Sequence, residues 1–352
     1  MRVLVINPGS TSTKIGVFDG PEQVLGESLL HSVSDSHQNR SVETRVNEIR
    51  SFLDSKGIDC KSFHAIGCRG GILPPVKSGT YRVDKRVVDY LLHSSPVDHP
   101  SNLAAPIGFM ISEGEIPVFI TDPVSVDEFC QEARYSGLPQ IPRVSRLHAL
   151  NMRAAARQIS EEFGRDLDSL NLVIAHLGGG ISVGLQLRGR MVDVNNANDE
   201  GPFSPTRTGE LPVGDVVKAC FSGRFSQREL ISRYTKEGGL KAYLGTDDFR
   251  KVMEMAESDA AAREVVEAMA YGIAKEIGGM CAVAGGKIDA IVLTGGMAYN
   301  SSFVELIKEY VSKFALVVIE PGENELLSLA LGAQRVLAGV EEAKTFDPEV
   351  LM

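Results

Sequence analysis

The stretch VLVINPGSTSTK, residues 3–14, decides how the rest of the chain is interpreted. Its first four residues are apolar and predict a buried strand. The Gly-, Ser- and Thr-rich turn that follows exposes backbone N–H groups and hydroxyls, which is how a phosphate-binding loop is built. The spacing matches neither the G-x-x-x-x-G-K-[ST] pattern nor G-x-G-x-x-G. Residues 15–18, IGVF, predict a second strand, so the turn joins a hairpin.

The same pattern occurs twice more along the chain. Residues 172–187, LVIAHLGGGISVGLQL, predict a strand, a Gly-rich turn and a strand. Residues 288–296, IDAIVLTGG, predict a strand that ends in paired glycines before a helix. One such hairpin is more often only a hairpin. Three such turns in order, at the ends of predicted buried strands, favour phosphate binding.

Composition excludes several classes of function. The 352 residues carry a net charge of -10, which argues against a general nucleic-acid binder. No apolar run approaches the length of a membrane span, and the apolar start at residues 3–6 is too short for a signal peptide. The five cysteines are scattered without a CxxC pair, which favours a reducing cytoplasm without a disulfide framework or structural zinc. We therefore expect a cytoplasmic protein with neither nucleic-acid nor membrane partners.

Several further elements follow from periodicity and capping signals. Amphipathic spacing predicts a helix over residues 41–56, and residues 258–283 predict one long Ala-rich helix. Ser226 and Glu229 form the capping-box pattern that begins a helix. Arg69 lies in a turn after a short apolar strand, and Asp122 follows a strand predicted at residues 116–120.

Two of these motifs resemble signatures of the acetate and butyrate kinases. INPGSTSTK at residues 6–14 resembles the first signature, and HLGGGIS at residues 176–182 resembles the second. Further matches keep the family's order: GCRGG at 67–71, HPSNL at 99–103, TDP at 121–123, RLH at 146–148, residues 289–296, and NEL at 324–326. The resemblance covers nearly the whole chain.

The resemblance implies an α/β fold of two actin-like (ribonuclease H-like) domains with a nucleotide cleft between them. It places the acid and phosphate side in residues 1–145 and the nucleotide-binding side in residues 146–331. A C-terminal helix at about residues 332–352 would pack back on the first domain.

The implied activity is reversible, Mg²⁺-dependent transfer of a phosphoryl group from ATP to a short-chain carboxylic acid, which gives an acyl phosphate and ADP. The resemblance favours butyrate kinase, acting on butyrate or a branched-chain acid such as isobutyrate, and a homo-oligomer. Acetate or propionate kinase and a non-enzymatic ATP-binding regulator on the same fold stay open. A sugar kinase is disfavoured by Asn7, because a sugar hydroxyl needs a carboxylate base at the end of the first strand.

The resemblance also assigns roles to individual residues. The catalytic candidates are Arg69, His148, Asn7 and Arg207. The candidates for binding the nucleotide and its phosphates are Ser10, Ser12, Lys14, His176, Gly178, Gly179, Gly180, Gly295 and Gly296. The candidates for the Mg²⁺ site are Asp122 and Glu325, and those for the acid pocket are Asn102, Leu147 and Pro205.

Structural roles are the alternatives for four of these residues. Arg69 would tie its own loop together, His176 would be a satisfied core histidine, and Asp122 would form an Asx-type turn before a proline. Glu325 would be an acid that stabilises a helix N-terminus. The resemblance favours the functional role for Arg69 and Asp122.

Two departures from the acetate kinase pattern concern the acid pocket. The segment FSP at 203–205 is followed by TRTG at a shorter spacing, so Arg207 is a candidate replacement for the family's second active-site arginine. Acetate kinases place an aromatic residue immediately before the active-site histidine, whereas this chain has Leu147 there. In this feature the chain resembles butyrate kinase more than acetate kinase. A smaller neighbour should widen the pocket, and each extra buried methylene is worth about 0.8 kcal/mol.

Overall fold

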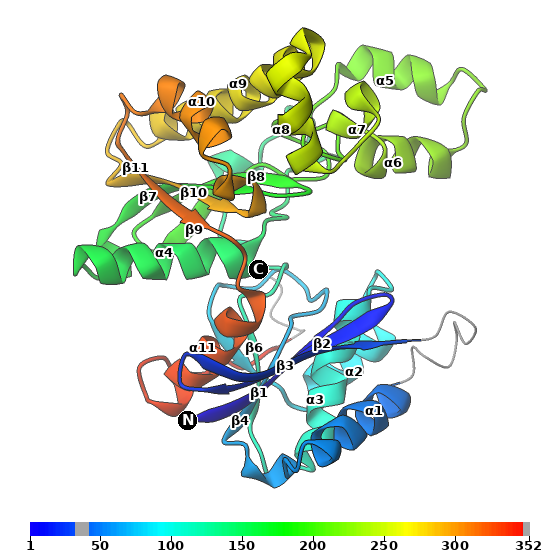
Figure 1. Cartoon of the computed structure of the whole chain (residues 1–352), viewed down its shortest axis with the longest axis vertical. Helices are drawn as coiled ribbons and strands as arrows, with labels where there is room; N and C mark the ends of the chain where they lie inside the picture. Colours follow the sequence, from blue (N-terminus) through cyan, green and yellow to red (C-terminus); the bar gives the residue numbers. More distant parts are fainter. Residues whose placement is uncertain (32–41, 348–352) are drawn as a thin grey trace. The chain divides into compact units, whose positions relative to one another are not determined.

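The computed structural model describes residues 1–31 and 42–347, which form two α/β units. Unit 1 consists of Met1–Asp127 and Asn324–Met352, and unit 2 consists of Glu128–Glu323. Each unit contains one mixed β-sheet and its own hydrophobic core. Figure 1 shows the elements of both units.

Unit 1 is built on a six-stranded sheet in the order β3-β2-β1-β4-β6-β5. Strands β1 and β2 form an antiparallel hairpin, while β1, β4 and β6 run parallel. The strands are β1 (Arg2–Pro8), β2 (Ser12–Asp19), β3 (Glu22–Leu30), β4 (Ala65–Cys68), β5 (Thr80–Arg82) and β6 (Val118–Thr121). The apolar run that opens the chain is therefore the predicted buried strand.

Helices cover both faces of the unit 1 sheet, which explains why β1 is buried on both sides (Figure 1). The helices α1 (Val42–Ser55), α2 (Lys85–His93) and α3 (Ala104–Ser112) share a core with alternate residues of β1, such as Leu4 and Ile6. On the other face, α11 (Glu325–Leu337) packs on β1, β4 and β6. The segment after unit 2 thus completes unit 1.

Unit 2 repeats this arrangement with a five-stranded sheet in the order β11-β10-β7-β8-β9. Strands β7, β8 and β9 are antiparallel, and β7, β10 and β11 are parallel. The strands are β7 (Asn171–Leu177), β8 (Ile181–Leu187), β9 (Arg190–Val194), β10 (Ala290–Gly295) and β11 (Leu316–Pro321). In both units a Gly-containing turn joins the first two strands, and a parallel strand lies beside the first.

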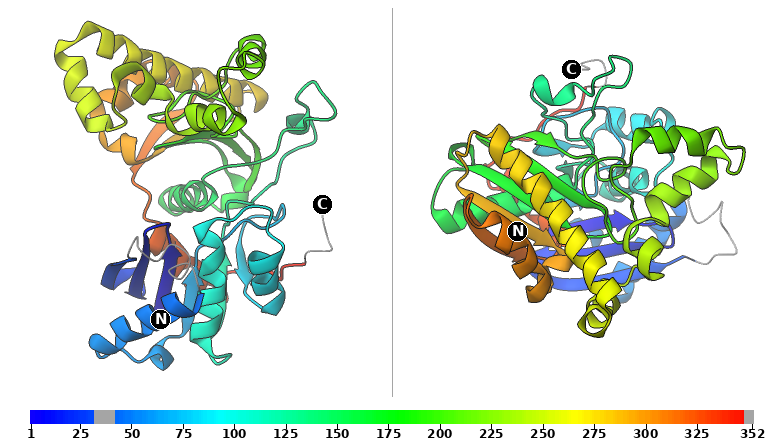
Figure 2. Two further views of the ribbon diagram at one scale, coloured as in Figure 1. Left: turned by 90° about the vertical axis from the view of Figure 1, so that its right-hand side faces the viewer. Right: turned by 90° about the horizontal axis from the view of Figure 1, so that it is seen from above.

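The helices of unit 2 also lie on both sides of its sheet. Figure 2 shows α9 crossing one face, where its apolar side packs on β7 and β8, and Figure 1 shows α4 on the other face. The helices are α4 (Ala149–Phe163), α5 (Val213–Cys220), α6 (Gln227–Lys236), α7 (Gly239–Leu244), α8 (Phe249–Ser258), α9 (Ala260–Val283) and α10 (Ser301–Val311). The short 3-10 helices are η2 (Cys60–Ser62), η3 (Pro100–Leu103), η4 (Glu132–Arg134), η5 (Leu167–Ser169) and η6 (Gly296–Tyr299).

The structure confirms the strands at all three Gly-containing turns, helix α1 and the capping box of α6. It also confirms the long Ala-rich helix expected at residues 258–283, which is α9 (Ala260–Val283). Asp259 ends α8 and caps α9, where its carboxylate accepts a hydrogen bond from the Ala261 N–H at 2.9 Å.

The units divide at Asp127/Glu128 and Glu323/Asn324, whereas residues 1–145 and 146–331 were expected. The segment that precedes α4 packs within unit 2. The Cys130 N–H donates to the Val192 carbonyl at 2.9 Å, and Arg143 pairs with Asp193 at 3.0 Å and with Glu200 at 3.1 Å. The last helix is also placed earlier than expected, at Glu325–Leu337, and residues 348–352 lie outside the described residues. Within residues 1–31 and 42–347, no helix has both the length and the hydrophobicity needed to cross a membrane.

Candidate active site

The first predicted phosphate turn lies at the surface of unit 1, between β1 and β2. The pairing of Asn7 with Lys14 and a hydrogen bond from the Gly9 N–H to the Ser12 carbonyl at 2.7 Å close the hairpin. Ser10 and Lys14 are exposed, and Ser12 is half-buried. The predicted phosphate-binding groups are therefore accessible.

Three predicted residues from distant parts of the chain meet beside this turn. Arg69, at the end of β4, forms an ion pair with the carboxylate of Glu325. The Asn7 amide donates to the other oxygen of Glu325 at 2.9 Å. Asn7 is buried, whereas the side chains of Arg69 and Glu325 are 36% and 26% exposed. The amide of the cluster is therefore shielded from solvent, and its two charged groups are accessible.

The positions of these three residues follow from the strands and the helix that carry them. The Arg69 N–H donates to the Ile6 carbonyl at 3.0 Å, which extends the pairing of β4 with β1. Glu325 is in the first turn of α11, where the helix dipole favours a negative charge. Glu325 is thus a helix N-terminal acid and, at the same time, a partner of Arg69.

The positive charge of Arg69 also acts on His99. Burial lowers the pKa of His99, the charge of Arg69 lowers it further, and Asp98 opposes the shift. The His99 ring lies 2.7 Å from the Ser101 hydroxyl and caps η3. His99 therefore packs its own loop.

Asn102 and Asp122 anchor loops of unit 1. The Asn102 side chain accepts from the Ile72 N–H at 2.8 Å and donates to the Val97 carbonyl at 2.8 Å, so it holds the loop that follows Arg69. Asp122 is 1% exposed, has a φ of 40°, and accepts from the Gly79 N–H at 2.7 Å. Both side chains have structural partners, and their places in the acid pocket and the Mg²⁺ site remain predictions.

Unit 2 carries a second cluster, centred on two stacked histidines. The rings of His148 and His176 are parallel within 15°, with centroids 3.9 Å apart. His148 stands at the N-cap of α4 without a side-chain capping bond, and its Nδ1 lies 3.0 Å from the hydroxyl of Ser182 on β8. His176 is the last but one residue of β7 and is 1% exposed.

The hydrogen bonds of Asn151 determine which nitrogen of His176 carries a hydrogen. The Asn151 Nδ2 donates to the Gly322 carbonyl at 2.9 Å, so its oxygen faces His176 Nδ1 at 2.6 Å and accepts from it. The other ring nitrogen, Nε2, lies 3.4 Å from the Glu323 carboxylate. His176 is therefore both a satisfied core histidine and a support for the face of His148.

The second Gly-rich turn packs against the segment that contains Arg207. The hydroxyls of Ser204 and Thr206 donate to the Gly179 carbonyl at 2.6 and 3.1 Å. A Cβ at Gly180 would collide with the Arg207 guanidinium, which donates to the Ala197 carbonyl at 3.1 Å. Burial lowers the pKa of Arg207, and Asp199 opposes the shift. The candidate replacement arginine thus lies next to the predicted phosphate loop.

The third turn lies at the end of β10, in the same unit. Gly295 has a φ of 90°, and a Cβ there would come within 2.5 Å of the Leu177 carbonyl oxygen, so only glycine fits. Gly296 is exposed, and the 3-10 helix η6 begins there before α10. Gly178 lies close to His176 Nε2. The ends of β7 and β10 therefore bring the second and third turns together.

The other predicted pocket residues of unit 2 are buried. Leu147 is 3% exposed, and the Pro205 carbonyl accepts from the Lys241 N–H at 3.0 Å. Sequence reasoning gave no role to Asn151, Ser182 or Glu323, although Asn151 follows His148 by one helical turn. Spacing of three on a helix places two side chains on one face, which was the available signal.

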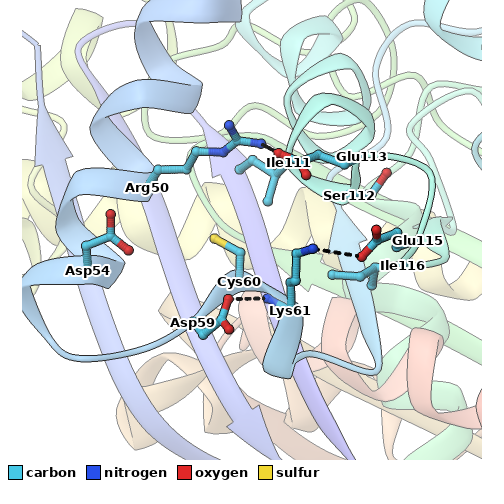
Figure 3. A pocket seen from close by; sticks show the side chains of 10 residues that line it. All are labelled: Arg50, Asp54, Asp59, Cys60, Lys61, Ile111, Ser112, Glu113, Glu115 and Ile116. Atoms are coloured by element: carbon cyan, nitrogen blue, oxygen red, sulfur yellow. Dashed lines mark hydrogen bonds and ion pairs between the residues drawn. The ribbon is translucent and has the colours of Figure 1, made fainter.

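A cavity of about 170 Å³ in unit 1 lies away from these turns, between α1, η2 and the end of α3 (Figure 3). Its cations are already paired: Arg50 with Glu113 at 2.6 Å and Lys61 with Glu115 at 3.3 Å. Burial raises the pKa of Cys60 in its wall, so the thiol stays protonated. This cavity offers neither an unpaired cation nor a reactive thiolate.

Comparison with known proteins shows the family to which the chain belongs. The profile of the acetokinase family matches residues 143–344, and a curated protein from Thermotoga petrophila, "Probable butyrate kinase", is 52% identical over 98% of both chains. The chain belongs to the acetokinase family. A second relative, "Probable butyrate kinase 1" from Thermotoga maritima, is 51% identical over 98% of both chains.

Solved structures show how widely the acetokinase fold is shared. Acetate kinase from Porphyromonas gingivalis matches with a TM-score of 0.82 at 18% identity, over 96% of this chain and 99% of that one. Propionate kinase from Francisella tularensis matches with a TM-score of 0.75 at 18% identity, over 94% of this chain and 98% of that one. A ROK family protein from Streptococcus pneumoniae matches with a TM-score of 0.54 at 13% identity, over 96% of this chain and 100% of that one. The fold is the actin-like ATPase fold that acetokinases share with ROK proteins.

Proposed function

We propose that this acetokinase is a butyrate kinase, which transfers the γ-phosphoryl group of ATP reversibly to butyrate or a branched short-chain acid and forms an acyl phosphate and ADP. The two Thermotoga relatives support the assignment. The observation that carries it is the cluster at the end of β1. There the chain presents the Asn7 amide and the Arg69 guanidinium, with Glu325 bonded to both.

This cluster suits a carboxylate acceptor better than a hydroxyl acceptor. A short-chain carboxylic acid, with a pKa near that of Glu at about 4.3, is ionised at pH 7 and needs no general base. A carboxylate oxygen attacks the γ-phosphorus in line, the new C–O–P bond forms, and the bond to the β,γ-bridging oxygen breaks to release ADP. No proton is transferred, so the protein has to position two anions and stabilise the charge on the equatorial oxygens.

We assign the cationic and donor groups to these tasks. Arg69 would bind the carboxylate or the transferring phosphoryl group through its planar fork. His148 would donate to the phosphoryl oxygens from Nε2, because its Nδ1 faces the Ser182 hydroxyl. Arg207, beside Gly180, would add positive charge at the second phosphate loop.

The phosphates and the nucleotide would contact the three turns. Ser10, Ser12 and Lys14 supply hydroxyls and a cation at the first turn. Gly178 to Gly180 leave backbone N–H groups accessible at the second, and Gly295 and Gly296 let the nucleotide approach the backbone at the third. Together these local donors would bind an anion despite the net charge of -10.

The donor set also fits a Mg²⁺ ion that arrives with the nucleotide. Kinases of this family use ATP and ADP, generally with Mg²⁺. Among the described residues no group of three or more metal-binding side chains occurs, which matches a mode of binding by one or two carboxylates plus substrate phosphates. Glu325 is partly exposed and would be one such carboxylate, whereas Asp122 is 1% exposed and already bonded to the Gly79 N–H. The bound ion would neutralise charge on the β- and γ-phosphates.

The acid preference would depend on the residue that precedes His148. Leu147 is smaller than an aromatic residue, so the space beside it would accept four-carbon or branched chains. Discrimination between acids that differ by one methylene is expected to be modest, about 10- to 200-fold at most. Asn102, which holds the loop after Arg69, and Pro205 are kept as the other candidates for binding the acid.

The test is a hydroxamate assay for acyl phosphate with ATP, Mg²⁺ and acetate, propionate, butyrate, isobutyrate or isovalerate. We expect the signal to peak at butyrate or a branched acid. A peak at acetate or propionate would leave the reaction intact and refute the pocket assignment. ATP binding without acyl phosphate from any acid would refute the kinase and favour a regulator. The homo-oligomer and the cytoplasmic location remain predictions.

A further inference from the structure

An arginine lies buried directly beneath the first phosphate turn. Arg45, in the first turns of α1, is 1% exposed, and its Nη1 and Nη2 lie 3.3 and 3.2 Å from the Gly9 carbonyl oxygen, to which both donate. Its Nη1 also donates to the Thr13 hydroxyl at 2.7 Å. One guanidinium therefore ties together both ends of the turn.

A short network surrounds this arginine. The fully buried Thr13 hydroxyl lies 3.0 Å from His31 Nε2, and His31 Nδ1 lies 3.0 Å from the Glu48 carboxylate on the next turn of α1. A buried guanidinium needs several hydrogen bonds and a compensating charge. The turn carbonyl and the Thr13 hydroxyl accept the hydrogen bonds of Arg45, and Glu48 follows Arg45 by three residues on α1.

The contact with Gly9 determines where the next N–H group points. In a trans peptide the carbonyl and the following N–H point in opposite directions, and the described chain has no cis peptide bonds. Because the Gly9 carbonyl faces the buried Arg45, the Ser10 N–H is directed away from it. The side chains of Ser10 and Thr11 are exposed on that outer side.

We propose that Arg45 is a positioning residue for phosphate binding. It holds the Gly9 carbonyl inward, so that the Ser10 N–H and the hydroxyls of Ser10 and Ser12 form a preorganised cradle for a nucleotide or acyl phosphate oxygen. Arginine suits the task because its planar fork reaches the carbonyl with two nitrogens and the hydroxyl at once, whereas lysine has one nitrogen. This inference rests on the proposed kinase function of the same turn.

The experiment compares Arg45→Lys and Thr13→Val with the control Arg50→Lys. Arg50 is on the same helix but pairs with Glu113 on the surface. We expect Arg45→Lys to raise KM for ATP about tenfold, since a charge-assisted hydrogen bond to the turn is lost. KM for the acid should change less than twofold. Thr13→Val should raise KM for ATP about threefold, and Arg50→Lys should leave it unchanged.

A second readout is binding of Mg-ADP by calorimetry, with the melting temperature recorded for each variant. Weaker ADP binding in Arg45→Lys supports the inference even if the wild type forms no acyl phosphate, which would refute only the proposed reaction. A lower melting temperature with ADP binding and KM for ATP both within twofold of wild type would show a purely structural role and overturn the inference. If the wild type binds neither ATP nor ADP, the inference falls as well.

Discussion

A single side chain, Glu325, links the residues that we place at the acid. One of its oxygens pairs with Arg69, and the other accepts from Asn7. When an anionic acid binds Arg69, it must compete with this carboxylate. The ion pair therefore holds the guanidinium in position before the substrate arrives, which limits the side-chain entropy lost on binding.

Removal of this guanidinium tests its role in turnover. We expect Arg69→Ala to lower kcat at least about a hundredfold, as is usual when a donor to a developing charge is deleted. The measurement is the initial rate of acyl hydroxamate formation. The control is Arg86→Ala, which removes an exposed arginine paired with Asp84 in the same unit.

The Arg69→Ala protein should melt within a few degrees of wild type, because the side chain is partly exposed. Near-normal turnover in this variant would remove Arg69 from the mechanism.

His31 should make stability depend on pH. Burial lowers its pKa, the neighbouring charge of Arg45 lowers it further, and Glu48 opposes the shift. The unfolded chain then binds the proton more tightly than the folded one. The contribution of neutral His31 is fully present above the unfolded pKa of about 6.5 and is lost as pH falls through the lower folded value.

We therefore expect the wild type to lose free energy of unfolding between pH 7.5 and 5.5, and His31→Gln to lose less over the same range. Urea unfolding at several pH values measures this difference. The exposed His93→Gln serves as the control and should follow the wild-type curve. Parallel curves for His31→Gln and wild type would contradict the prediction.

Leu147 tests the acid pocket. Leu147→Phe should shift preference toward acetate or propionate, because a larger side chain beside His148 narrows the space for the acyl chain. Since Leu147 is 3% exposed, overpacking should also cost about 1–3 kcal/mol of stability. Leu150→Phe, in the first turn of α4, is the matched control and should cost stability without changing the acid profile. An unchanged profile in Leu147→Phe would place the pocket elsewhere.

Among single residues, the sequence predicted those on turns better than their buried partners. Asn7, Arg69 and Glu325 were identified through motifs and meet in the structure. Arg45, Asn151 and Ser182 were given no role, because their contacts are with residues far away in the sequence. Apart from the spacing of Asn151 from His148, a single sequence contains no signal for such pairs.

Close packing of α11 on the sheet depends on glycines. A Cβ at Gly67 would come within 2.9 Å of the Leu329 carbonyl oxygen, and one at Gly332 would collide with the buried Thr121 hydroxyl. The missing side chains let the helix lie close enough to the strands for Glu325 to reach Asn7 and Arg69.

Gly332→Ala should therefore destabilise unit 1, although alanine is favoured in a helix by about 1 kcal/mol. We expect a net loss of about 1–3 kcal/mol from the clash with Thr121. Gly279→Ala in α9 is the matched control, because a Cβ there meets no atom within 4 Å, and it should be neutral or stabilising. Urea midpoints measure both effects. A Gly332→Ala protein as stable as Gly279→Ala would show that β6 yields to the added methyl.

The elements themselves were largely predictable, because hydrophobic runs and caps are local signals. The long helix expected at residues 258–283 is α9, and only its first residue differs by two positions. Ser258 still belongs to α8, and the Asp259 carboxylate caps the next helix. The cap therefore determines where the helix begins, and the composition alone does not.

The two units have separate hydrophobic cores with no common member among the described residues. Because the chain contains no tryptophan, one introduced tryptophan reports a single unit. Phe52→Trp on α1 would report unit 1, and Phe249→Trp on α8 would report unit 2.

We expect Gly332→Ala to lower the urea midpoint of the Phe52→Trp signal and to leave that of Phe249→Trp unchanged. Separate cores make such independent transitions the expected behaviour of a chain with more than one domain. A shift of both signals by the same amount would instead show that the whole chain unfolds cooperatively.

The repeated hairpins predicted two units, but not where they divide. The strand-turn-strand pattern at residues 3–18 and 172–187 marks the start of each sheet. Residues 128–147 carry no regular pattern, and their assignment to unit 2 depends on bonds such as those of Arg143 to Asp193 and Glu200. Irregular segments are placed by such long-range contacts, which spacing does not reveal.

The dependence of unit 1 on α11 has a consequence for protein synthesis. The strands β1, β4 and β6 leave the ribosome before any of unit 2, but the helix that covers one face of their sheet is translated only after Glu323. At typical elongation rates the delay is on the order of ten to forty seconds. During that time the nascent chain exposes an apolar sheet face that molecular chaperones can bind, and it lacks Glu325. Translation that stops early therefore yields a polypeptide without the assembled cluster of Asn7, Arg69 and Glu325.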